Sequence, residues 1–291
     1  MSRQGLAPIG ALNVRIMNMT AATPPNPDRP RVGLFVTCLA DLVRPQVGFA
    51  ALKLLEDAGC IVEVPLTQTC CGQPAFNSGA TAIAADFARK LIREFETFDY
   101  VVVPSGSCAG MIKAHYREAL AGDATWLPRA EALAAKTWEL MSFLVDVRGF
   151  RPEGVSLPVS ATYHDSCSGL RELGVFEQPR ALLGAVSGLE LKPLEGNDVC
   201  CGFGGTFCVK YPDIANAIVT GKAEAVKASG AAMLLGGDLG CLMNMAGKLS
   251  REGSRVLVGR DQTSIAARVR VMHAAEVLAG MGAGPALGED D

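Results

Sequence analysis

The sequence predicts an α/β protein built from two tandem, pseudo-symmetric copies of one parallel-sheet domain. The first observation is a repeated pattern, because eight of the ten cysteines fall into two sets with nearly equal spacing. Each set has a single cysteine, then an adjacent pair followed by glycine, then another single cysteine. The second observation is that short apolar segments alternate with amphipathic ones, which is typical of strands and helices in parallel α/β units. The sets are Cys38, Cys70, Cys71 and Cys108, and Cys167, Cys200, Cys201 and Cys241.

Length and composition are compatible with two domains. The chain has 291 residues, of which 49% are hydrophobic, so each half has enough apolar material to bury a core of its own. The net charge of -3 and the absence of clustered Lys and Arg argue against a nucleic-acid surface. The longest apolar runs fall far short of the roughly 20 residues that a membrane-spanning helix needs. A soluble protein is therefore expected.

Residues 1–30 are expected to form a flexible extension. This stretch ends in four closely spaced prolines and has neither a helical nor a strand period. Polar residues such as Asn13 and Arg15 interrupt the one segment that could serve as an export signal. We therefore expect the protein to be cytoplasmic, where clustered cysteines are more often ligands or redox groups than disulfides.

The first copy is expected over residues 31–150. A short apolar run over 32–36 predicts a buried strand that ends just before Cys38. A helix over 45–58 follows, because Pro45 suits its first turn and Gly59 its end. The remaining expected elements are a strand over 61–64, a helix over 77–95, a strand over 100–103 and helical material over 128–147.

The second copy is expected over residues 151–280, with a flexible tail over 281–291. Its expected elements are strands over 159–163, 189–191, 232–235 and 269–272, and helices over 178–186 and 214–227, with a last helix that ends at Leu278. This alternation predicts two Rossmann-like sheets. Ligands of such sheets bind beyond the carboxyl ends of the strands, so the four cysteines of each copy should gather at one edge.

Four converging thiolates favour metal chemistry. They satisfy either a tetrahedral zinc ion or an iron–sulfur cluster. In an adjacent pair such as Cys70 and Cys71 the two sulfurs point apart, which suits a cluster of several metal atoms better than a single ion. Gly72 and Gly202 allow main-chain N–H groups to point at sulfur. A lone cysteine is often a small buried hydrophobic residue, but two sets in the same register are poorly explained that way. Spacing alone therefore predicts two metal–thiolate sites.

At these residues the sequence resembles a known family. The pattern is similar to the CCG cysteine-rich domain of heterodisulfide reductase B subunits, of the iron–sulfur subunits of glycolate oxidase and anaerobic glycerol-3-phosphate dehydrogenase, and of lactate-utilisation proteins. The resemblance is greatest to the lactate-utilisation protein A family and covers residues 31–280. The matching segments are Tyr163 to Cys167, Cys200 to Phe207, Gly240 to Met243 and Val271 to Leu278.

The resemblance implies an iron–sulfur electron-transfer subunit that oxidises L-lactate to pyruvate together with two companion subunits. At least one companion would carry further iron–sulfur clusters. Each domain would hold one cluster, of the 4Fe-4S type, on its four cysteines, and no catalytic residue is identified. Two alternatives stay open: an iron–sulfur subunit for another 2-hydroxy acid or glycerol-phosphate dehydrogenase, and a non-redox module that holds zinc on four cysteines and assembles partners.

The sequence also departs from the resemblance. Heterodisulfide reductase relatives end each copy with Cys-x-x-Cys, but the last positions here are Met111 and Asn244. Four cysteines per copy therefore favour a four-iron cubane over a five-thiolate cluster. Cys208 lies outside the repeated register and is either a bystander or a substitute ligand. Cys60, at the start of a strand, is expected in the core.

Other polar residues have two possible roles each. His164 and Asp165 precede Cys167 and could move protons or orient the site, or they could make hydrogen bonds at a loop end. His115 and His273 lie in expected helical segments without a visible partner. Arg171 is either a carboxylate anchor or part of a solvated helix face. No flavin or nicotinamide motif is present.

Overall fold

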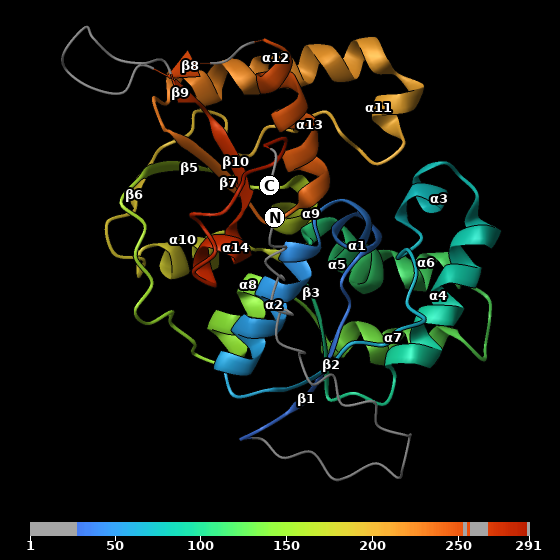
Figure 1. The fold of residues 1–291 in the computed structure, drawn as a ribbon. Coiled ribbons are helices and arrows are strands. Elements are labelled where there is room, and N and C mark those ends of the chain that lie inside the picture. Colours follow the sequence, from blue (N-terminus) through green and yellow to red (C-terminus); the bar gives the residue numbers. More distant parts are fainter. Residues whose placement is uncertain (1–27, 253–254, 257–266, 290–291) are drawn as a thin grey trace, which may run out of the picture.

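The computed structural model describes residues 28–252, 255–256 and 267–289. Two four-stranded sheets, with all neighbours parallel, form the centre of the molecule (Figure 1). The first sheet has the order β2-β1-β3-β4 and the second the order β10-β7-β5-β6. The strands are β1 (Arg31–Leu34), β2 (Ile61–Glu63), β3 (Tyr100–Val103), β4 (Thr137–Glu139), β5 (Ser160–His164), β6 (Glu190–Lys192), β7 (Met233–Gly236) and β10 (Arg270–His273).

The two sheets have the same connectivity. When β5, β6, β7 and β10 are matched with β1, β2, β3 and β4, the strand order is second, first, third, fourth in both sheets, with the second sheet read from β6 to β10. The tandem α/β fold predicted from the cysteine repeat is therefore confirmed. A separate antiparallel pair, β8 (Arg255–Val256) with β9 (Ala267–Arg268), interrupts the second copy.

The helices of the first copy follow its sequence patterns. In α4 (Thr81–Phe95), Ala88, Ile92 and Phe95 repeat at helical spacing and are buried. Pro45 occupies the first turn of α2 (Pro45–Asp57), as expected. The other helices are α1 (Cys38–Val43), α3 (Gln73–Asn77), α5 (Gly106–Gly110), α6 (Tyr116–Ala119), α7 (Leu127–Lys136) and α8 (Leu140–Ser142), with π-helical turns η1 (Met111–His115) and η2 (Phe143–Val147).

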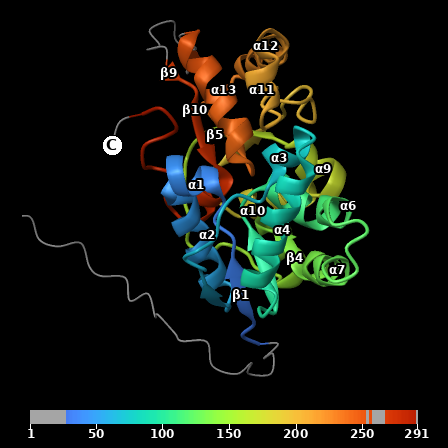
Figure 2. The same cartoon turned by 90° about the vertical axis from the view of Figure 1, so that its right-hand side faces the viewer.

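The helices of the second copy are α9 (Cys167–Leu173), α10 (Glu177–Leu183), α11 (Phe207–Lys210), α12 (Pro212–Ala228), α13 (Leu239–Arg251) and α14 (Ala274–Leu278). α3 and α11, which follow the two cysteine pairs, face each other in two perpendicular views (Figures 1 and 2). The hydroxyl oxygens of Ser78 and Thr206 lie 3.2 Å apart at this contact. The segments that follow the two cysteine pairs therefore meet at the boundary between the copies.

One expected helix proves to be wrong in part. The helical material predicted over 128–147 is interrupted by β4, which pairs with β3 through Trp138 and Val102. A three-residue strand between two helices has no period of its own, and Trp138, the single apolar residue of β4, could not be distinguished from a position in a helix. This strand completes the first sheet.

The hydrophobic interior crosses the boundary between the copies. One continuous cluster contains Leu54 and Leu144 of the first copy together with Met272 and Leu278 of the second. The two copies therefore share this cluster, while a second cluster of buried residues lies within the first copy. α2 also packs against α14, and a buried ion pair joins them, with 2.9 Å between Arg44 Nη2 and Glu276 Oε1.

The described end of the chain packs against the second sheet. The main-chain N–H of Leu287 donates to the carbonyl of Val271 at 2.9 Å, and Ala286 is buried. Residues 281–289 therefore differ from the fraying tail that the sequence suggested. The N-terminal extension expected over 1–30 lies outside the described residues except for its last three. Among the helices of the described residues, none has the length and hydrophobicity to cross a bilayer.

Candidate metal centres

The first cysteine set (Cys38, Cys70, Cys71 and Cys108) forms one continuous group of sulfur atoms. Cys38 begins α1 just beyond β1, and Cys108 lies in α5 just beyond β3. The sulfurs of Cys71 and Cys108 are 3.4 Å apart. Thiol contacts also join Cys38 to Cys70 and Cys70 to Cys71. The sheet topology thus brings these four residues together.

The second cysteine set (Cys167, Cys200, Cys201 and Cys241) is assembled in the same way. Cys167 begins α9 beyond β5, and Cys241 lies in the first turn of α13 beyond β7. Thiol contacts join Cys167 to Cys200, Cys200 to Cys201 and Cys201 to Cys241. The structure therefore gathers both sets, while their role as ligands stays a prediction.

Glycine main chain supports one sulfur in each set. Gly72 and Gly202 have φ angles of 89° and 82°, a conformation that glycine adopts readily. Their N–H groups point at the sulfurs of Cys70 at 3.4 Å and Cys200 at 3.3 Å. A side chain at position 202 would also collide with the carbonyl of Ala215, because its Cβ would lie 2.6 Å from that oxygen. The cysteine-pair loops therefore require glycine.

The proton affinities of the thiols indicate that each set is made for a cation. The pKa of Cys70 is lowered because Cys38 donates to its sulfur, and the pKa of Cys200 is lowered by Cys167 in the same way. The pKa of the Cys71 thiol is raised by its contact with Cys108 and by burial. Each set therefore contains one thiol that ionises readily, and ionising a buried neighbour such as Cys71 as well needs a positive charge among the sulfurs. This donor set fits a metal ion or an iron–sulfur cluster.

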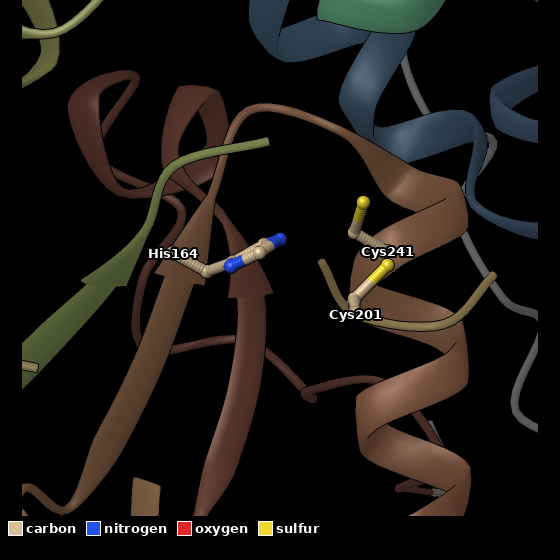
Figure 3. Close-up of side chains that lie close together, drawn as sticks. All are labelled: His164, Cys201 and Cys241. Carbon is tan, nitrogen blue, oxygen red and sulfur yellow. The ribbon is translucent and has the colours of Figure 1, made fainter. Parts of the chain in front are cut away.

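His164 points at the second cysteine set (Figure 3). It is the last residue of β5 and is 1% exposed, and one ring nitrogen and the sulfurs of Cys201 and Cys241 lie within 4.8 Å of one another. Neither ring nitrogen has a hydrogen-bond partner among the described residues. Burial, and then the charge of Lys222, lower the pKa of His164 to about 4. The imidazole is therefore neutral near pH 7.

Asp165, the neighbour of His164, has a different role. Its buried carboxylate accepts two hydrogen bonds from Arg180, at 2.9 and 2.7 Å, and one from the Asn197 amide at 2.5 Å. Arg180 also stacks on the Phe176 ring. This arrangement matches the loop-end hydrogen bonding that the sequence left open for Asp165.

Four further residues bear on the ligand count. The Asn244 amide donates to the carbonyl of Cys201 at 2.9 Å, and Met111 is fully buried in the first copy. The Cys208 thiol donates to the carbonyl of Gly205 at 3.5 Å, and no sulfur contact joins it to the second set among the described residues. Cys60 lies in the hydrophobic cluster that the copies share.

The remaining candidates have structural partners. His273 ends β10 and caps α14, with its Nδ1 accepting from the N–H of Ala275 at 3.2 Å, so the helical position expected for it is corrected. His115 lies 3.6 Å from the carboxylate of Glu172. Arg171 donates to the carbonyl of Asp198 from an exposed position on α9.

Lys222 was missed by sequence reasoning. This residue of α12 is 3% exposed, and its ammonium donates to the carbonyls of Gly196 and Asn197, the latter at 3.2 Å. Its charge acts on the thiols of Cys201 and Cys241. In the sequence it resembles any lysine of an amphipathic helix. Ala215 and Ala84 pack against the two loop glycines, and counting seven residues on from each matches Lys222 with Leu91. This exchange of an apolar for a charged residue between the copies was a signal in the sequence.

The two sites are held close by a contact between α5 and α9. Gly106 of α5 and Gly169 of α9 meet so closely that a Cβ on Gly106 would lie 2.8 Å from the Cα of Gly169. These helices contain Cys108 and Cys167, which belong to different sets.

Comparison with known proteins identifies the repeat. The family model of the CCG cysteine-rich domain matches residues 32–113 and 161–246. Lactate utilization protein A of Exiguobacterium sp. is 46% identical over 251 residues, which cover 86% of this chain and 97% of that protein. The protein of the same name from Geobacillus thermodenitrificans is 48% identical over 248 residues, which cover 85% of this chain and 98% of that protein.

A solved structure has a similar fold. The crystal structure of a hypothetical protein from Helicobacter pylori superposes with a TM-score of 0.60 at 10% identity. The superposition covers 94% of this chain and 52% of that one, so this chain spans about half the length of its structural neighbour. At this identity the likeness concerns the fold alone.

Proposed function

Because this chain belongs to the lactate utilization protein A family of CCG cysteine-rich proteins, we propose that it is an iron–sulfur protein of lactate utilisation. More specifically, it is the electron-transfer subunit of a complex that oxidises L-lactate to pyruvate. The observation that carries the iron–sulfur proposal is the gathering of eight cysteines into two sets of four neighbouring sulfurs. The substrate is inferred from the names of relatives that align with most of the chain.

The eight cysteines would hold one cluster per copy, and we expect the 4Fe-4S type. Such a cluster supplies reversible one-electron transfer when bound. The chain's own groups stabilise the negative charge of the thiolates. The N–H groups of Gly72 and Gly202 donate to sulfur in both sets, and Lys222 adds a buried positive charge at the second.

The oxidation of the hydroxy acid itself is assigned to a companion subunit. Removing two electrons and two protons from lactate, as a hydride from carbon and a proton from the hydroxyl, needs a base, a cation for the carboxylate and a two-electron acceptor. Arg171 is the cation that the sequence suggested, but it is exposed and bonded to the carbonyl of Asp198. We therefore propose two companions in the cytoplasm, of which at least one carries further clusters.

Metal analysis tests the iron–sulfur proposal. Protein purified without oxygen should be brown and contain iron and acid-labile sulfide in excess over zinc. Colourless protein with about one zinc per four cysteines would support the assembly module instead. The substrate is tested separately by supplying the assembled complex with L-lactate, glycolate and glycerol 3-phosphate. If glycolate or glycerol 3-phosphate reduced the clusters faster than L-lactate does, that compound would be the substrate in place of lactate.

A further inference from the structure

The two cysteine sets differ at two matching positions. His164 stands three residues before Cys167, and Phe35 stands three residues before Cys38. The loop glycines provide a second alignment, because Gly202 lies against the carbonyl of Ala215 in α12 and Gly72 against that of Ala84 in α4. Counting the same distance along both helices matches Lys222 with Leu91. The duplicated fold therefore carries an imidazole and an ammonium in one copy where the other has two hydrocarbon side chains.

The first cysteine set is backed by hydrocarbon. Phe35 is fully buried, with its ring packed edge-on against Phe95 at a centroid distance of 5.8 Å. Phe35, Leu91 and Cys71 belong to one hydrophobic cluster. At the positions that match His164 and Lys222 this set therefore offers no donor, and the buried Tyr116 hydroxyl beside it donates to the carbonyl of Cys71 at 2.9 Å.

The second set has an additional donor without a partner. A buried polar atom without a hydrogen bond is rare because its desolvation is not compensated. Both ring nitrogens of His164 are in this condition among the described residues. The carbonyl of Asn197 lies near enough to interact with the ring but not in hydrogen-bonding geometry, and it already accepts from the N–H of Asp165 and from Lys222, each at 3.2 Å. The ring is left facing the sulfurs of Cys201 and Cys241.

We propose that His164 is a metal ligand of the second cysteine set, so that this set offers five donors and the first offers four. The inference rests on the proposed iron–sulfur function. Metal–sulfur bonds near 2.3 Å and metal–nitrogen bonds near 2.1 Å place two donors on one ion roughly 3.5 to 4 Å apart. The imidazole nitrogen and the two sulfurs all lie within 4.8 Å of one another, so a metal atom held by either sulfur would lie within reach of the nitrogen after small side-chain movements.

The two centres would then have different properties. The imidazole is a neutral ligand, and Lys222 places a positive charge beside Cys201 and Cys241. Both features stabilise the reduced, more negative form of a cluster. The second centre therefore has the higher reduction potential, so electrons that enter at the first centre are transferred to the second.

Magnetic coupling to histidine nitrogen tests the proposal directly. The protein is produced with ¹⁵N in histidine only, loaded with iron and sulfide without oxygen, reduced and examined by pulsed EPR. The chain has three histidines, so few nitrogens contribute. We expect a ¹⁵N coupling of the strength of a bonded nitrogen. His164→Phe, which installs the first copy's residue, should abolish this coupling and lower the potential of one centre. His115→Phe should leave both unchanged.

The outcomes separate this proposal from the proposed function. Iron–sulfur signals without a histidine coupling in the labelled wild-type protein overturn the ligand assignment and leave the iron–sulfur function standing. That measurement needs no substitution, so a folding defect in His164→Phe cannot obscure it. Protein that takes up zinc alone overturns the iron–sulfur function. Its sites are then filled with Co²⁺, and the ligand assignment stands or falls on whether the cobalt signal shows the histidine coupling.

Discussion

The carboxylate of Asp238, in the second copy, accepts a hydrogen bond from the hydroxyl of Ser105, in the first, at 3.0 Å. It also accepts from the main-chain N–H of Ser107 at 2.9 Å. Asp238 immediately precedes the helix of Cys241, and Ser105 immediately precedes that of Cys108. A single buried carboxylate therefore links the segments that supply one cysteine to each site.

Replacing Asp238 with alanine should destabilise the protein. The donors on Ser105 and Ser107 would lose their buried acceptor, which typically costs about 1–3 kcal/mol. We expect a lower midpoint in chemical denaturation, measured by circular dichroism. Asp86→Ala is the matched control, because that side chain is 78% exposed. Equal midpoints for the two variants would show that the link between the copies contributes little.

Glu139 should make the folded protein less stable as the pH rises. Burial, helped by the charges of Asp238 and Asp146 and opposed by the N–H groups of Ser142 and Met141, raises the pKa of this carboxyl to about 8. Tyr163 also lies close enough to interact with it. Between about pH 4.5 and 8 the unfolded chain loses this proton while the folded chain keeps it. The free energy of unfolding should therefore fall by up to about 1.4 kcal/mol per pH unit.

Glu139→Gln tests this pH dependence. In the wild type the Glu139 carboxyl accepts a hydrogen bond from the N–H of Ser142 at 3.0 Å. The glutamine amide has an oxygen that can accept the same bond, and it does not ionise. We expect the variant to gain stability over the wild type steadily from about pH 5 to about pH 8, measured by urea denaturation at each pH. Glu131→Gln, at an exposed position of α7, is the control. Parallel curves for Glu139→Gln and wild type would contradict the prediction.

Each cysteine set should lose its own metal independently. Cys70→Ser and Cys201→Ser each break one complete set, so each should remove about half of the bound iron and leave the other centre's EPR signal intact. Cys208→Ser should keep all of the iron, because that thiol contacts the carbonyl of Gly205 instead of the second set. Equal loss from both centres on either of the first two substitutions would indicate one shared site.

Cys60 should matter for stability and not for iron. It is buried in the shared hydrophobic cluster, and burial raises the pKa of its thiol. Cys60→Ala should lower the unfolding free energy by roughly 1 kcal/mol and leave the iron content at the wild-type level. Bleaching of the purified variant would place Cys60 among the ligands.

The isolated chain should not oxidise lactate. With its clusters intact but without its companions, it should not reduce an artificial acceptor on addition of L-lactate, because the proposed centres take electrons singly. Activity should appear when the companion subunits are added. A turnover rate for the single chain comparable with that of the complex would place the catalytic centre here.

Sequence reasoning reached the repeat, the parallel sheets and the grouping of the cysteines, because strand ends and cysteine spacing are local signals. It missed β4, since three residues between helices show no period. It also missed Lys222, whose burial depends on how α12 packs beside the second set. His273 was placed in a helix because a cap at a strand end differs little from a first turn in sequence. What escaped prediction was set by tertiary contacts.

Gly106 and Gly169 meet main chain to main chain, which is nearly as close as two polypeptide segments can come. In the proposed electron-transfer role this contact matters because it keeps the two centres close, and electron tunnelling weakens exponentially with distance. The helices that carry Cys108 and Cys167 touch at two glycines, neither of which has a Cβ atom. A methyl group on Gly106 would push the helices apart, and the proposed electron transfer between the two centres would slow before any ligand was lost.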